Sequence, residues 1–418
     1  MRLRDLLKRL GPGFITGASD DDPAGIGTYV QAGAQFGYLQ LWTALFTFPV
    51  MSVVQEMCGR IGTVTGQGLA AVIRNNYARP VLFFIVTIQV VTNTINIGAD
   101  LSAMAESAKL LLHLSYTLLL AAVTALTTVL IVVVPYRTYA AYLKILGLTL
   151  LTYVASAFMV RVPWGHIAIA TFVPHVEWHK DFLLTLLAVF GVTISPYEFF
   201  WQSSEEVEEL VENHKIPEEE AERPNITRRD VQGVRYDTVF GMFFSNAVTF
   251  FIIVVAAATL HARGVTNVQS AVQAAQVLRP IAGADTSLLF ALGIVSAGLL
   301  SIPVMAASSA YAVGGAFEWR RSLRKTLREE PRFYGIIIAS CVVGIAVNLA
   351  HIPPFKLLYY SGVLNGVISP PLLFIVTQIA SNKRIMGRFV NPPLPTALGW
   401  LLCAFTALLI VAFFVFSR

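Results

Sequence analysis

Runs of about 20 apolar residues recur along almost the whole chain, and this pattern limits the fold more than any other feature. Of the 418 residues, 56% are hydrophobic and only 13% are charged, which is too apolar for a soluble protein of this length. A run of this length spans a bilayer as a helix, because backbone in lipid must satisfy its own hydrogen bonds. We predict an all-α polytopic membrane protein with eleven spans, at about 12–34, 40–58, 81–112, 117–134, 139–160, 183–206, 236–260, 287–315, 334–350, 355–379 and 396–416.

The positive charges predict an orientation for these spans. With the N-terminus in the cytoplasm, 23 of the 30 Lys and Arg residues fall in cytoplasmic segments, and cytoplasmic loops of membrane proteins carry such an excess. We therefore predict a multi-pass protein of the plasma (inner) membrane with its N-terminus inside and its C-terminus outside. The net charge of +5 then reflects this topology, and we expect the lipid bilayer rather than nucleic acid as the surroundings.

The first predicted span contains three consecutive acids, Asp20, Asp21 and Asp22, followed at once by Pro23. One charged side chain at the bilayer centre costs about 2.5–3.5 kcal/mol even on the mildest scale, so the three acids need counter-ions, water or a bound cation. Pro23 lacks an amide hydrogen and Gly25 is a poor helix former, so we expect the helix to break there and free backbone carbonyls. Carboxylates beside unwound backbone at the middle of a membrane predict a cation site.

The sixth predicted span carries a second break signal, because Pro196 follows Ser195 in its middle. The two broken spans start five spans apart, which indicates two inverted halves of five helices with a site between them. We predict one transmembrane domain over 1–418, with a first repeat at about 12–160 and a second at about 183–379. The eleventh helix, at about 396–416, lies outside the repeat.

These segments resemble the Nramp family of divalent-metal transporters over nearly the whole chain. Residues 22–25, Asp-Pro-Ala-Gly, resemble the Asp-Pro-Gly-Asn motif of the family, and 11–14, Gly-Pro-Gly-Phe, resemble the start of its first span. Residues 195–197, Ser-Pro-Tyr, stand where the family has Met-Pro-His. The resemblance implies a LeuT-like fold of two inverted five-helix repeats with the first and sixth helices broken.

The resemblance also implies a set of metal ligands and shows where this chain departs from it. The family binds a transition metal through the Asp, Asn and Met of these motifs and through two backbone carbonyls. The corresponding positions here are Asp22, Gly25 and Ser195, with the carbonyls at Ser19 and Val192. Either Asp20 or Asp21 could also attract the ion or bind it through water. Without the soft thioether, and with smaller side chains, the site becomes roomier and all-oxygen, which suits a partly hydrated Mg²⁺ and resembles the Nramp-related magnesium transporter branch.

A second group of departures concerns proton coupling. The family moves protons with two His residues in the sixth span and acids in the third, and these positions correspond here to Tyr197, Gln202, Asn93 and Asn96. None of these side chains titrates usefully near neutral pH, so we predict transport without proton coupling. Glu198 replaces a family Asn and could line the ion pathway.

Four other polar residues fall within predicted spans. Glu56 and Glu106 lie toward span ends, where a structural ion pair is the expected role, and the sequence assigns no role to Asp100. Asn365 could bond across helices or line the pathway, and the sequence leaves both readings open.

The predicted function is uptake of Mg²⁺, and also of Mn²⁺, by alternating access of a monomer that is not an enzyme and needs no cofactor. A proton-coupled Mn²⁺/Fe²⁺ importer of the same family remains the alternative. A Na⁺-coupled transporter of organic solutes would need a Na⁺ site between spans one and eight, which the sequence does not show. An intramembrane aspartyl protease would need Tyr-Asp and Gly-x-Gly-Asp motifs on facing helices, and neither occurs in this role.

Overall fold

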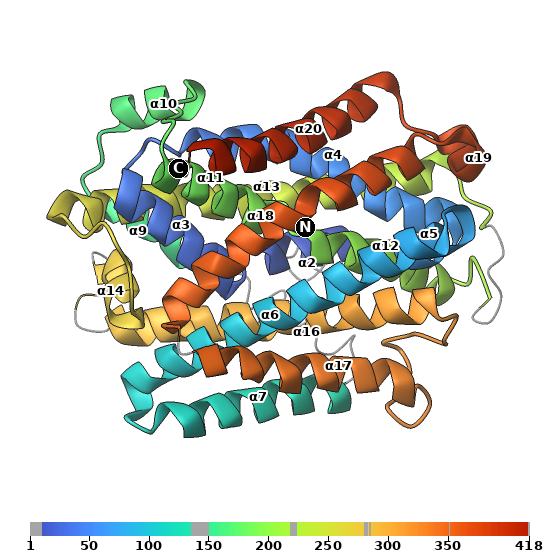
Figure 1. Ribbon diagram of the computed structural model, residues 1–418, viewed down its shortest axis with the longest axis horizontal. Helices are drawn as coiled ribbons and strands as arrows, with labels where there is room; N and C mark the ends of the chain where they lie inside the picture. The colour runs from blue at the N-terminus through green and yellow to red at the C-terminus, as the bar shows by residue number, and fades with distance from the viewer. Residues whose placement is uncertain are drawn as a thin grey trace, which may run out of the picture.

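The protein is a bundle of helices, seen here in a computed structural model that describes residues 11–134, 150–217, 224–279, 283, 286–350 and 352–416 (Figure 1). This part of the chain contains no strand. Its α-helices are α2 (Pro12–Asp20), α3 (Pro23–Phe36), α4 (Trp42–Thr65), α5 (Leu69–Asn76), α6 (Arg79–Leu112), α7 (Tyr116–Val133), α9 (Leu151–Met159), α10 (Trp164–Phe172), α11 (Lys180–Thr193), α12 (Pro196–Glu212), α13 (Arg228–Thr259), α14 (Ala271–Ala275), α16 (Thr286–Ala316), α17 (Pro331–Gly344), α18 (Pro354–Ala380), α19 (Lys383–Met386) and α20 (Pro393–Phe416). Short 3₁₀ helices are η2 (His261–Arg263), η3 (Gln276–Leu278), η5 (Ile345–Ala350) and η6 (Gly387–Phe389).

Eight helical segments of the described residues are long and apolar enough to cross a membrane, if α11 and α12 are taken together. The others are α6, α7, α13, α16, α17, α18 and α20, and all eight overlap predicted spans. The remaining predicted spans correspond to α2 with α3, to α4, and to the segment that ends in α9. Since 139–149 of the predicted fifth span lie outside the described residues, the total of eleven spans stays a prediction.

The first predicted break is present, but it lies slightly earlier than the sequence suggested. α2 ends at Asp20, and α3 begins at Pro23 with Asp22 as its N-cap. Proline suits the first position of a helix because its missing amide hydrogen would be unpaired there anyway. Gly25 was expected in the unwound segment, but it lies inside α3, and its amide donates to the Asp22 carboxylate over 2.5 Å. The cap bond holds this turn in helical geometry despite the glycine.

At the second break the helix also restarts at a proline. α11 ends at Thr193, Ser195 is the N-cap of α12, and Pro196 is its first residue. Unlike Asp22, Ser195 makes no side-chain cap bond, because its hydroxyl donates back to the Val192 carbonyl over 2.9 Å. Two helices therefore restart at an X–Pro step, one with a charged cap and one with a neutral residue.

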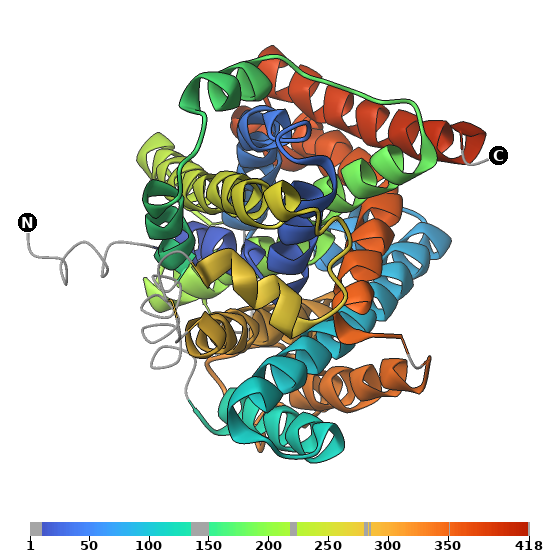
Figure 2. The same ribbon diagram turned by 90° about the vertical axis from the view of Figure 1, so that its left-hand side faces the viewer.

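The four half-helices lie inside the bundle. α7 and α17 lie side by side along one edge of the molecule, and α20 lies along the opposite edge (Figure 1, Figure 2). Between these edges every residue of α2 is buried, as are most residues of α3 and α11. An interior position exposes the breaks to protein groups rather than to lipid.

Glycine pairs bring the half-helices close to their neighbours. A side chain at Gly17 of α2 would overlap the backbone of α13 at Gly241, and one at Gly191 of α11 would overlap α18 at Gly362. Small residues permit such close backbone approach in membrane bundles, where packing replaces the hydrophobic effect as the driving force. The two helices ahead of the breaks are therefore fixed against neighbours by backbone contact.

Candidate metal site

The two helix breaks meet in the interior of the bundle. The hydroxyl of Tyr197, at the start of α12, donates to the backbone carbonyl of Ser19, near the end of α2, over 2.8 Å. The Ser308 hydroxyl of α16 in turn donates to the Tyr197 carbonyl over 2.6 Å. Residues 178 positions apart are thus joined at the place where both helices are unwound.

The first break holds the three predicted carboxylates, and each has different partners. Asp22 accepts from the Gly25 amide, and Asp20 accepts from the Ser245 hydroxyl of α13 over 2.7 Å. Both carboxylate oxygens of Asp21 are buried without a hydrogen-bond partner, as is one oxygen of Asp20. Because an ionised carboxylate is costly to bury without partners, this break needs positive charge or protons.

Two more carboxylates reach the same region from other helices. Asp100 of α6 accepts from the Ala24 amide over 3.2 Å and from the Ser301 hydroxyl of α16 over 3.3 Å. Since Ala24 and Gly25 are neighbours, Asp100 and Asp22 lie side by side at the N-terminus of α3. The positive end of the α3 dipole stabilises negative charge there.

Glu198 is the second of these carboxylates. It lies in the first turn of α12 and accepts a short hydrogen bond from the Gln55 amide of α4. Its other oxygen is buried without a partner. The sequence suggests that Glu198 could line the ion pathway, and the structure places it beside the second break.

These five carboxylates, Asp20, Asp21, Asp22, Asp100 and Glu198, are at most 2% exposed. None of them forms an ion pair with a Lys, Arg or His residue of the described part of the chain. The region is therefore strongly acidic and buried from solvent in this structure.

The carbonyl positions are not free in this conformation. The Ser19 carbonyl accepts from Tyr197, and the Val192 carbonyl accepts from Ser195. An added Cβ at Gly25 would lie 3.2 Å from the Asp20 carbonyl and 3.3 Å from an Asp22 carboxylate oxygen. A larger side chain at Gly25 would thus press on the two acids nearest to it.

The carboxylates do not converge on one point. Among the residues that the structure describes, no three His, Cys, Asp or Glu side chains lie where they could together hold one metal ion. A cation bound between the breaks would therefore complete its shell with hydroxyls, backbone carbonyls or its own water.

The four altered proton-path positions hold neutral hydrogen-bonded networks. Asn93 donates to the Met305 carbonyl and to the Ser309 hydroxyl of α16. Asn96 donates to Asn365 of α18 over 2.8 Å, so Asn365 bonds across helices. Tyr197 is bound to Ser19 as described, and the fourth position, Gln202, donates to the Thr238 hydroxyl of α13 over 2.6 Å.

The sequence profile of the natural resistance-associated macrophage protein-like (Nramp) family matches residues 13–416. The chain belongs to the Nramp family. The resemblance inferred from the motifs at the two breaks is therefore confirmed over residues 13–416.

Named Nramp relatives are metal transporters. The chain is 27% and 28% identical to two proteins from Klebsiella pneumoniae, each named divalent metal cation transporter MntH, over 408 residues that cover 95% of this chain and 91% of each relative. Both names agree with the prediction that this Nramp chain is a transporter and not an enzyme.

Solved structures show the same fold. A manganese transporter from Eremococcus coleocola matches with a TM-score of 0.74 at 18% identity, covering 97% of this chain and 86% of that one. Mhp1, a nucleobase-cation-symport-1 family transporter, matches with a TM-score of 0.62 at 14% identity, covering 98% and 92%. The predicted all-α, LeuT-like architecture with two broken helices is thus confirmed for this Nramp protein, which is a multi-pass membrane protein.

Sequence reasoning missed one residue of the acidic region. The sequence identifies Asp100 as an acid within a span but assigns it no role, although it lies four residues after Asn96 and hence on the same face of α6. That spacing was the available signal. For the other acids the expectation of an ion pair holds at Glu56, which pairs with Arg60 over 3.0 Å. Glu106 instead accepts from the Ala271 amide over 3.3 Å.

Proposed function

We propose that this Nramp protein is a divalent metal cation transporter that carries Mg²⁺, and also Mn²⁺, into the cell by alternating access without proton coupling. The single observation that carries the proposal is the acidic region at the breaks: five buried carboxylates without a described cationic partner. Buried charges of one sign need compensation, and a dication supplies more of it than any single side chain. The names of the relatives support a divalent metal as the substrate.

The donor set supports a hard cation. Asp22 offers a carboxylate, Ser195 a hydroxyl, and Ser19 and Val192 backbone carbonyls. All of these are oxygen donors, which suit Mg²⁺ and Mn²⁺, whereas a thioether selects softer ions. Mg²⁺ retains several waters and is usually held by one or two carboxylates, and Asp22 with Asp100 provides such a pair. Asp20 and Asp21 lie close enough to Asp22 to add negative charge.

The neutral networks support uncoupled transport. Asn93, Asn96, Gln202 and Tyr197 replace titratable residues, and each is engaged in fixed hydrogen bonds. The ion would then be driven by its own gradient and by the membrane potential, which contributes about 2.3 kcal/mol per charge per 100 mV and twice that for a dication. Glu198, bonded to Gln55, would line the route between the breaks and the cytoplasm.

The arrangement in the membrane is part of the proposal. We place a monomer in the plasma membrane with a cytoplasmic N-terminus and an outer C-terminus, on the distribution of Lys and Arg residues. α2 and α12 then lie on the cytoplasmic side of their breaks, and α3 and α11 on the outer side.

Ion binding tests the site. We expect isothermal titration of Mg²⁺ and Mn²⁺ to show binding to the wild type and its loss in Asp22→Ala. Glu329→Gln, which removes a fully exposed carboxylate, is the matched control and should bind as the wild type does. Undiminished Mg²⁺ binding by Asp22→Ala would remove the proposed site.

Transport tests the ion and the coupling. In proteoliposomes with an internal pH indicator, Mg²⁺ uptake should proceed without internal acidification, and excess Mg²⁺ should suppress Mn²⁺ uptake. If the interior acidifies in step with uptake, and excess Mg²⁺ does not reduce Mn²⁺ uptake, the results would instead support the proton-coupled Mn²⁺/Fe²⁺ importer.

A further inference from the structure

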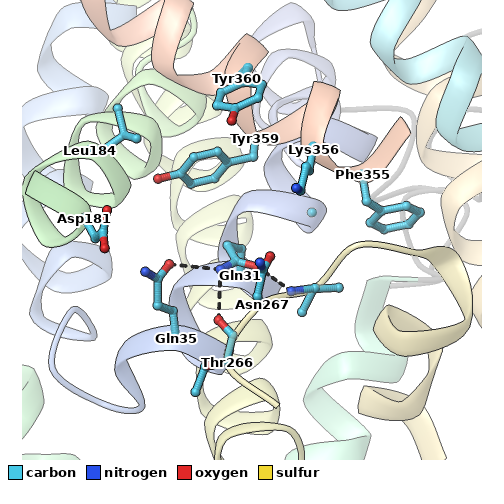
Figure 3. A pocket seen from close by; sticks show the side chains of 12 residues that line it. Gln31, Gln35, Asp181, Leu184, Thr266, Asn267, Phe355, Lys356, Tyr359 and Tyr360 are labelled. Carbon is cyan, nitrogen blue, oxygen red and sulfur yellow. Dashed lines mark hydrogen bonds between the residues drawn. The ribbon is translucent and has the colours of Figure 1, made fainter. Parts of the chain in front are cut away.

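A polar cavity of about 330 Å³ lies between α3, α11 and α18, away from the helix breaks (Figure 3). Its floor is formed by Gln31, which donates to the Gln35 side chain over 2.9 Å and to the Thr266 carbonyl over 3.2 Å. Gln31 also accepts from the Val268 amide over 2.8 Å, which fixes the loop between η2 and α14 against α3. The cavity therefore has a rigid, hydrogen-bonded wall.

Two residues of opposite charge lie in this cavity. Figure 3 shows the Asp181 carboxylate of α11 on one side, the Lys356 ammonium of α18 on the other, and the Tyr359 ring between them. No ion pair joins Asp181 to Lys356 in the structure as described. Asp181 is exposed and Lys356 is half-buried, so both charges can act on an ion that arrives from solvent.

All three helices that line the cavity lead to the breaks. On α3, Gly27, Gln31 and Gln35 are spaced by four residues, so they form one face that runs outward from the Asp22 cap. α11 runs from Asp181 to the second break, and the Ser369 hydroxyl of α18 donates to the Ile194 carbonyl at that break over 3.4 Å. The cavity is thus the outer end of the route toward the proposed ion site.

Packed residues of α3, α11 and α18 close this route. An added Cβ at Gly27 would lie 2.9 Å from a Leu358 methyl carbon, and one at Gly362 would lie 2.7 Å from a Val192 methyl carbon. Beside them the Tyr29 hydroxyl is hydrogen-bonded to Thr193 over 3.0 Å. An ion in the cavity would therefore wait until α18 moves away from α3 and α11.

The size of the cavity matches a hydrated ion. At about 30 Å³ per water, its volume holds about 11 waters, which exceeds the six ligands of an octahedral Mg²⁺ shell. Apart from Asp181 and Lys356, the polar lining residues are neutral amides and hydroxyls, namely Gln31, Gln35, Thr266, Asn267, Tyr359 and Tyr360. Neutral groups of this kind bind the waters of an ion without stripping them.

We propose that this cavity is an outer waiting site for a fully hydrated divalent cation, in which Asp181 attracts the ion and Lys356 limits its residence. The proposal rests on the proposed function and extends it, because it assigns the step before dehydration to a second site. Weak, water-mediated binding there would raise the local ion concentration without trapping the ion.

The experiment measures Mg²⁺ uptake against external Mg²⁺ in intact cells that express charge variants. Removing one unit charge about 9 Å from a hydrated dication changes its affinity by about fivefold in a water-like dielectric. We expect Asp181→Asn to raise KM by about that factor and Lys356→Gln to lower it, with the maximal rate at saturating Mg²⁺ unchanged. Glu177→Gln is the control for Asp181→Asn, and Lys180→Gln is the control for Lys356→Gln. Each control removes a charge of the same sign near the N-terminus of α11, at a residue that does not line the cavity.

Two further measurements separate charge from structure. Asp181→Glu and Lys356→Arg should behave as the wild type, and the shifts in KM should shrink in high salt, where screening shortens the reach of a charge to about 3 Å at 1 M. If Asp181→Asn and Lys356→Gln have the same KM as their controls, the waiting site is overturned. It is also overturned if Asp181→Glu and Lys356→Arg change KM as much as the neutral variants do. Both outcomes would leave the proposed function intact. Absence of saturable Mg²⁺ uptake by the wild type would overturn the proposed function itself.

Discussion

The two helix breaks have the same backbone design but opposite chemistry. Each restarts at a proline, yet the first is capped by the charged Asp22 and the second by the neutral Ser195. The first break gathers Asp20, Asp21 and Asp100 around it, whereas the second has one carboxylate, Glu198, and hydroxyl groups that bond to backbone carbonyls. The difference teaches that repeating a backbone feature does not repeat its function: we propose that the first break supplies most of the charge for the ion and that the second supplies mainly neutral contacts.

The largest expected effect tests this division directly. Asp22→Asn should weaken Mg²⁺ binding on the order of 100-fold, because loss of one buried charged partner costs about 3 kcal/mol. Ser195→Ala removes only a neutral hydroxyl and should weaken binding by about threefold or less. Isothermal titration of both variants provides the comparison, and equal losses would show that the breaks contribute alike.

The next largest effect concerns the glycines ahead of each break. Gly17→Ala and Gly191→Ala should each destabilise the protein by about 2 kcal/mol, because the new methyl group would overlap a neighbouring backbone. Gly165 of α10 has no atom near an added Cβ, so Gly165→Ala serves as the control. Thermal unfolding of the purified protein measures the difference. If only one of the two variants is destabilised, the two half-helices are not fixed in the same way.

A smaller effect is expected at the carboxylate that the sequence did not assign. Asp100→Asn keeps an acceptor for the Ala24 amide but removes a charge beside Asp22, so Mg²⁺ affinity should fall about tenfold. Ser301→Ala removes a hydrogen-bond donor to Asp100 and leaves the charge in place, so it should change affinity much less. Equal behaviour of the two variants would mean that Asp100 is a structural anchor rather than part of the acidic region.

The smallest expected effect is a change in selectivity at the second break. Ser195→Met restores a soft thioether, which should shift preference toward Mn²⁺ or Cd²⁺ over Mg²⁺ by about fivefold without abolishing transport. Competition between Mn²⁺ and Mg²⁺ in uptake assays measures the shift. An unchanged preference would indicate that the residue at 195 does not face the ion. The proposal that the second break contacts the ion through neutral groups would then be wrong at this residue.

The sequence determined the class of the protein and the location of both breaks. Long apolar runs can satisfy their backbone in lipid only as helices, and Pro23 and Pro196 cannot donate to the preceding turn. Both rules act within a few residues of the chain, so they can be read without knowing any tertiary contact. For the same reason the motifs around Asp22 and Ser195 were enough to indicate the Nramp family.

Only the tertiary structure decided which groups share the site. Asp100 reaches the Ala24 amide across 76 residues of sequence, and Tyr197 covers the Ser19 carbonyl across 178. The packing of α6 and α12 against the first break sets these contacts, and helical periodicity alone gives the face of a residue but not its neighbour. The outer cavity is of the same kind, since Asp181 and Lys356 come from α11 and α18 and share it only because those helices pack together.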